Sequence, residues 1–75
     1  MTTYKNLGGD SGIDSYEIGA DSITVRFKDG SFYLYTAQSA GAANIEEMKA
    51  LAEAGRGLNG FIKRRVNKLF ARKWK

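Results

Sequence analysis

The sequence predicts an α+β domain in which a three-stranded antiparallel β-meander is followed by two α-helices packed on one face of the sheet. Apolar side chains alternate with polar ones through much of residues 13–36, and an Asp-Gly pair separates two of these runs. Apolar positions then recur at helical spacing after residue 44 and again after residue 57. A chain of 75 residues without Cys suits one domain stabilised by hydrophobic burial alone.

The predicted strands span residues 13–18, 23–27 and 32–36. The first ends at a Gly-Ala-Asp turn, and the second alternates apolar with polar side chains, which predicts one buried face and one solvent-exposed face. Asp29 and Gly30 then predict a tight turn into the third strand, because Gly readily adopts the positive φ angle that such a turn requires.

The two predicted helices follow the strands. Asn44, three residues before Glu47, is a candidate N-cap, and Gly55 is placed to end this helix after residue 54. After a Gly-rich corner, Asn59 is the candidate cap of a second helix over about residues 60–75. The core-facing stripe expected on this helix comprises Ile62, Val66, Leu69 and Phe70.

The predicted domain covers residues 12–75. Residues 1–11 are polar and Gly-rich, and we expect them to form a flexible N-terminal lead-in. The N-terminus has no signal-peptide pattern and no apolar run is long enough to span a membrane, so a cytoplasmic location is expected.

Charge is distributed very unevenly along the chain. Residues 56–75, here named the cationic segment, carry eight Lys and Arg and no acid, whereas residues 1–55 carry four basic and eight acidic residues. Charges near +8 and −4 therefore sum to the net charge of +4. An asymmetry of this kind points to a polyanionic partner.

On the predicted second helix the basic side chains would form one face. Arg64 with Lys68, and Lys68 with Arg72, are like-charged i,i+4 pairs, which repel by a few tenths of a kcal/mol each and which phosphates would relieve. The alternative interpretation is a merely solvated face, helped by the negative end of the helix dipole. The candidate nucleic-acid-binding residues are Arg64, Arg65, Lys68, Arg72 and Lys75, together with Lys63 and Arg56.

Three aromatic residues have two interpretations each. Tyr33 and Tyr35 share one face of the third predicted strand, where they either stack on nucleic-acid bases or pack within the sheet. Trp74 either packs on the core, stacks on a base, or inserts at a membrane interface.

The residue inventory argues against catalysis. Without His and Cys the chain has no Ser-His dyad, no Cys nucleophile and no His- or thiolate-ligated metal site. We therefore expect no enzyme activity, no cofactor and no metal.

Two motifs resemble the KTSC domain, a family named for the C-terminal extension of certain lysyl-tRNA synthetases. One is F-x-x-G-x-x-Y-x-Y, formed by Phe27, Gly30, Tyr33 and Tyr35. The other is a G-x-x-N-x-x-I corner, formed here by Gly55 or Gly57 with Asn59 and Ile62. The resemblance covers most of residues 13–66, implies a β-meander with packed helices and no established activity, and leans towards RNA.

The function predicted from the sequence is a small non-catalytic module that binds RNA or DNA through a basic C-terminal helix. The alternative is a protein-protein interaction domain that docks on an acidic partner through the same helix. Binding to an anionic membrane surface through Trp74 and the basic helix is a third interpretation.

Overall fold

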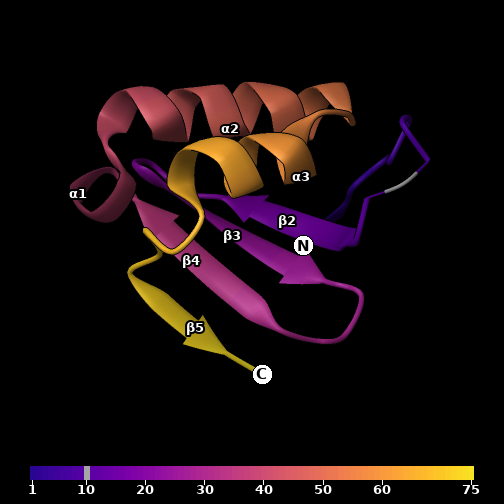
Figure 1. The fold of residues 1–75 in the computed structure, drawn as a ribbon, viewed down its shortest axis with the longest axis horizontal. Helices are drawn as coiled ribbons and strands as arrows, with labels where there is room; N and C mark the ends of the chain where they lie inside the picture. Colours follow the sequence, from indigo (N-terminus) through magenta and orange to yellow (C-terminus); the bar gives the residue numbers. More distant parts are fainter. Residues whose placement is uncertain (10) are drawn as a thin grey trace.

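The computed structural model describes residues 1–9 and 11–75, in which helices cover one face of a five-stranded antiparallel sheet of strand order β1-β2-β3-β4-β5 (Figure 1). The α+β class with an antiparallel meander is confirmed, whereas the expected counts of three strands and two helices are wrong. The elements in chain order are β1 (Thr2–Thr3), β2 (Ile13–Ile18), β3 (Ser22–Phe27), β4 (Phe32–Thr36), α1 (Ala37–Ala40), α2 (Ala42–Ala54), α3 (Leu58–Phe61), the π-helical turn η1 (Ile62–Val66) and β5 (Arg72–Trp74).

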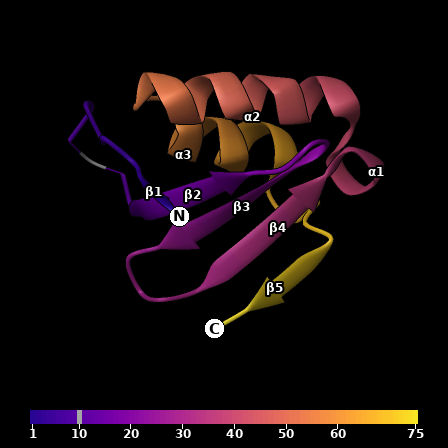
Figure 2. The same ribbon diagram turned by 180° about the vertical axis from the view of Figure 1, so that it is seen from behind.

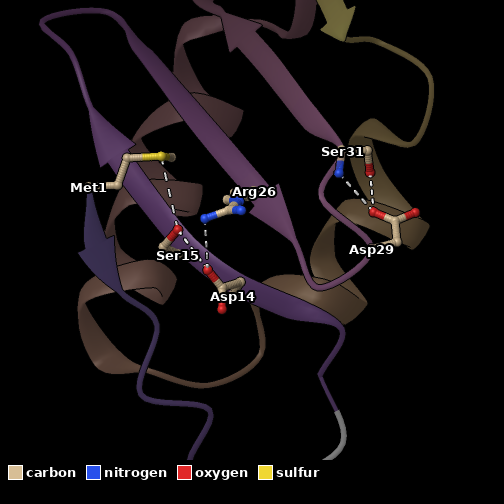
Figure 3. A network of polar contacts seen from close by, with 6 residues as sticks. All are labelled: Met1, Asp14, Ser15, Arg26, Asp29 and Ser31. Carbon is tan, nitrogen blue, oxygen red and sulfur yellow. Dashed lines mark hydrogen bonds and ion pairs between the residues drawn. The ribbon is translucent and has the colours of Figure 1, made fainter. Parts of the chain in front are cut away.

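The three predicted strands correspond to β2, β3 and β4, and the Asp-Gly turn joins β3 to β4. Gly30 has a φ of +93°, as the turn requires. The Asp29 Oδ1 atom accepts hydrogen bonds from Ser31 Oγ at 2.6 Å and from Ser31 N at 2.9 Å (Figure 3). These bonds favour the carboxylate and hold the pKa of Asp29 below its usual value.

The N-terminal residues belong to the fold, which corrects the prediction of a lead-in outside the domain. Thr2 and Thr3 form β1 and pair with β2. Tyr4 is only 4% exposed, and its hydroxyl accepts a hydrogen bond from Leu58 N at the start of α3. Asp10, in the same predicted lead-in, lies outside the described residues.

The core lies between the sheet and the helices. Alternation along β3 turns Ile23 and Val25 towards the helices, where both are fully buried. The other large side chains that are fully buried are Ile13, Tyr35, Ile45, Met48, Leu58 and Val66.

The first predicted helix corresponds to α2, whose end at Ala54 is confirmed. Gly55 takes the left-handed conformation at φ +79° and caps it. The start differs from the prediction, because Asn44 lies inside α2 and its side chain donates a hydrogen bond to Ala40 O at 2.8 Å. The short helix α1 before it was not predicted, although Thr36 and Ser39 form its capping box.

The second predicted helix, over residues 60–75, is wrong beyond Val66. Helix α3 starts at Leu58 after Gly57, so Asn59 is not its cap, and η1 ends at Val66 with Asn67, whose φ is +32°, as its C-cap. The chain then turns and runs back as β5 beside β4 (Figures 1 and 2).

Side chains of β4 explain this turn. The Tyr35 hydroxyl donates to Asn67 O at 3.0 Å, and Phe70 packs edge-on against Tyr33 and Tyr35. Strand β5 then satisfies backbone groups of β4 that would otherwise form an unpaired sheet edge. Leu69, expected in the core, is 47% exposed.

Candidate nucleic-acid interface

The basic residues after residue 62 lie on two elements and the connections that follow them rather than on one helix face. Lys63, Arg64 and Arg65 lie on η1, in the helical layer, and Lys68 lies in the connection after it. Arg72 and Lys73 lie on β5, followed by Lys75, so the segment leaves the helical layer and ends along the β4 edge of the sheet (Figures 1 and 2). The single cationic helix face expected from the sequence is therefore wrong.

All eight basic side chains of the cationic segment are exposed. Within residues 1–9 and 11–75, the ion pairs join Arg26 to Asp14 at 3.7 Å and Lys49 to Glu46 at 3.3 Å. None of the eight cations therefore pairs with a carboxylate in the described part of the chain. The segment presents eight positive charges to solvent. Two of them, Lys73 and Lys75, add to the Ser31 hydrogen bonds in lowering the pKa of Asp29.

Burial of two side chains orients the cations of η1. Ile62 and Val66 are 5% and 0% exposed and face the core, which leaves the three residues between them towards solvent. Arg64 and Arg65 also line a hollow of about 500 Å³ beside α2, with Glu47 on the opposite element. The carboxylate of Glu47 reduces the positive potential in that hollow.

Arg56 lies apart from the η1 cations. It lies in the turn between α2 and α3 and lines a smaller hollow of about 180 Å³ together with Tyr4 and Asn6. No other Lys or Arg lines this hollow within the residues that the structure describes.

The two candidate stacking tyrosines share a face, as predicted, but that face lies under the helices. Tyr35 is 1% exposed, so its ring has no free surface for a base; of the two interpretations, packing within the sheet holds for Tyr35 and stacking does not. Burial raises the pKa of Tyr35 to about 12. The Tyr33 ring is partly buried, edge-on to Phe27 and Phe70, with Lys73 Nζ 5.2 Å from its centroid.

The opposite face of the sheet carries an aromatic cluster that joins Arg72 and Trp74, both considered from the sequence, to Phe32 and Arg26, which were not. Phe32 on β4 pairs with Trp74 on β5, and their rings are parallel to within 2° at a centroid distance of 5.3 Å. The guanidinium of Arg26 lies 5.4 Å from the centroid of the Phe32 ring, and that of Arg72 lies 5.6 Å from the Trp74 centroid. We name Arg26, Phe32, Trp74 and Arg72 the aromatic ladder.

Period-two alternation already places Phe32 opposite to Tyr33 on β4, and this was the available sequence signal. The pairing with Trp74 depends on β5, which lies within the stretch predicted as the second helix and shows no strand signal of its own. Arg26 also contacts Asp14 on this open face (Figure 3), and both side chains are about half exposed.

The described part of the chain offers neither a cluster of metal ligands nor a helix that could span a membrane. Within residues 1–9 and 11–75, no group of three or more Asp, Glu, His or Cys is placed to hold a metal ion. No helix in this part of the chain has the length and apolar character needed to cross a membrane.

Comparisons of the chain with protein-family models, with curated proteins and with solved structures find no match.

Proposed function

We propose that this protein is a small non-catalytic module that binds nucleic acid through the cationic segment. One observation carries the proposal: eight Lys and Arg side chains are exposed, and none of them pairs with a carboxylate within the described residues. Such a surface gains free energy from phosphates, because each phosphate that it neutralises releases condensed counterions.

The two parts of the cationic segment would contact phosphates on two sides of the molecule. The η1 cations Lys63, Arg64 and Arg65 face solvent beside α2, while Arg72 lies on the open face of the sheet and Lys75 follows β5. Lys68 lies in the connection between them. A flexible polymer that bends around the β4 edge would reach both parts. The KTSC resemblance stays a prediction, and it favours RNA over DNA as this polymer.

A salt series tests the proposal. We would measure binding of single-stranded and duplex RNA and DNA of about 12 nucleotides by fluorescence anisotropy and NMR shift mapping. Contact with about four phosphates predicts a log-log salt slope near −3 to −4, with the largest shifts in residues 56–75. No binding at about 50 mM salt would overturn the proposal and direct the search to an acidic protein partner.

Charge reversal locates the site. The double variant Arg64→Glu, Lys68→Glu changes two exposed side chains and is expected to abolish binding while the fold is retained, as circular dichroism would verify. The matched control is Lys5→Glu, Lys28→Glu, which makes the same change in net charge at exposed positions outside the segment. Equal losses for the two double variants would show that net charge, and not the cationic segment, determines binding.

A further inference from the structure

We propose that the preferred partner is a single-stranded nucleic acid, held along β4 and β5 on the open face of the sheet with a base stacked on Trp74. This inference rests on the proposed function and specifies the form of nucleic acid and the residue that contacts its base.

The open face lies on the side of the sheet away from α2 and α3 (Figure 2). On the other face, which the helices cover, Tyr35 is nearly inaccessible and Tyr33 is partly buried. Trp74, in contrast, is 39% exposed although it stacks on Phe32. An indole that is held against a neighbouring ring and still partly open to solvent is pre-oriented to accept a base.

The aromatic ladder supplies both the ring and the charge that a nucleotide requires. Arg72 lies over the Trp74 ring, and an exposed cation-π contact of this kind is weaker than a base stacked on an aromatic ring. A base can therefore displace the guanidinium from the ring, and Arg72 remains close enough to bind the adjoining phosphate. Phe32 contacts Arg26 as well as Trp74. We expect its stacked ring to hold the indole of Trp74 in this orientation.

Charge on the open face sets where the strand would lie. Within residues 1–9 and 11–75, the acids that β2 places on this face are Asp14, which forms an ion pair with Arg26, and Glu17, which lies opposite Thr24 of β3 in the strand register. Arg72 and the terminal Lys75 lie at the opposite edge. A polyanion is therefore expected to follow β5 and to continue towards Lys68, and not to cross β2.

This geometry favours single strands over duplexes. The bases of a duplex are stacked on one another, whereas those of a single strand are free to stack on protein rings. The carboxylates of an acidic peptide would pair with the cations, but such a peptide has no base to stack on the indole. An experiment must therefore distinguish a single-stranded nucleic acid from an acidic peptide.

Intrinsic fluorescence tests the inference with the unmodified full chain, because Trp74 is its one Trp. We would titrate the protein with three probes: a single strand of about 12 nucleotides, an abasic deoxyribose-phosphate strand of the same length, and poly-glutamate. The single strand is expected to quench the Trp fluorescence. The abasic strand is expected to bind about 5- to 150-fold more weakly, with the same salt slope and without quenching.

Three variants complete the test. Trp74→Leu keeps an apolar side chain but has no ring, and we expect it to lose about 5- to 150-fold in single-strand affinity, whereas Trp74→Phe retains most of it. The control is Leu69→Ala, which removes an exposed apolar side chain from the same segment and should leave affinity unchanged. Circular dichroism establishes that each variant is folded; if Trp74→Leu is not, the abasic comparison decides.

The outcomes separate this inference from the proposed function. Equal affinity for the abasic and the normal strand without quenching would overturn base stacking and leave phosphate binding intact. Poly-glutamate that binds as tightly as the single strand and quenches equally would overturn the assignment of a nucleic acid. Failure of every oligonucleotide to bind would overturn both.

Discussion

At the scale of single residues, Tyr35 connects the sheet to the cationic segment. Its ring is buried in the core, and its hydroxyl donates to Asn67 O at the point where the helical part of the segment ends. The sequence pattern that suggested a base-stacking tyrosine therefore marks a structural residue. Trp74, one strand away and on the other face, has the exposure that a stacking residue requires.

We predict that Tyr35→Phe lowers the free energy of unfolding by about 0.5–1.5 kcal/mol near neutral pH, because it removes this hydrogen bond and leaves Asn67 O without its partner. The raised pKa adds a pH dependence. The native state retains the Tyr35 proton up to about pH 12, whereas the unfolded state loses it near pH 10. The stabilisation that comes from the protonated Tyr35 hydroxyl is therefore fully present below about pH 10.

The stability that Tyr35 contributes should therefore decline as the pH rises from about 10 to about 12. Urea unfolding of the wild type and Tyr35→Phe at neutral and alkaline pH measures the difference, and the other titrating groups cancel because both proteins share them. A stability difference that stays constant to pH 12 would contradict the assignment.

At the scale of elements, the turn at Asn67, directly after η1, decides where the cations lie. Asn67 has a φ of +32°, and positive φ angles are avoided by β-branched side chains and adopted readily by Gly. If the helix continued, Arg72 and Lys75 would lie on the same helix face as Arg64. Because the chain turns here, Arg72 lies on the open face of the sheet instead.

We predict that Asn67→Val lowers the free energy of unfolding by about 1–3 kcal/mol, since a β-branched residue strains this backbone. Asn67→Gly is the matched control and should leave stability unchanged or higher, because it relieves the same strain. Thermal and urea unfolding would measure the stability of both variants. If Asn67→Val and Asn67→Gly were equally stable, residue 67 would not require a positive φ angle.

At the scale of the whole molecule, β5 is an addition to a domain whose core is complete without it. The fully buried side chains all lie before residue 67, whereas every residue of β5 is exposed. Strand β5 closes the β4 edge and brings Trp74 onto Phe32. The core and the proposed base-binding surface are thus separable.

We predict that a chain ending at Phe70 stays folded but is less stable by about 1–3 kcal/mol, from the lost strand pairing and the lost ring stack. A domain of this size has about 4–11 kcal/mol of stability, which exceeds that loss. Circular dichroism with urea unfolding measures stability, and hydrogen exchange at the β4 amides should rise selectively. Complete unfolding of the truncated chain would show that β5 belongs to the core.

Local patterns account for the elements that could be predicted. Alternation of apolar and polar residues, with the turn at Asp29 and Gly30, was enough to predict β2, β3 and β4. Gly55 was enough to predict the end of α2. In the candidate site, Ile62 and Val66 are four residues apart and were expected to face the core. This spacing was enough to predict that Lys63, Arg64 and Arg65 between them are exposed.

The sequence by itself thus determined the central meander, the helix that covers it and the excess of positive charge after residue 55, because each depends on neighbours within a few positions. Only the tertiary structure decided that Thr2 and Thr3 form a strand, that the cationic segment turns at Asn67, and that Trp74 meets Phe32. Edge strands such as β1 and β5 are extended because a sheet edge offers hydrogen bonds, and that edge exists only after the meander has folded.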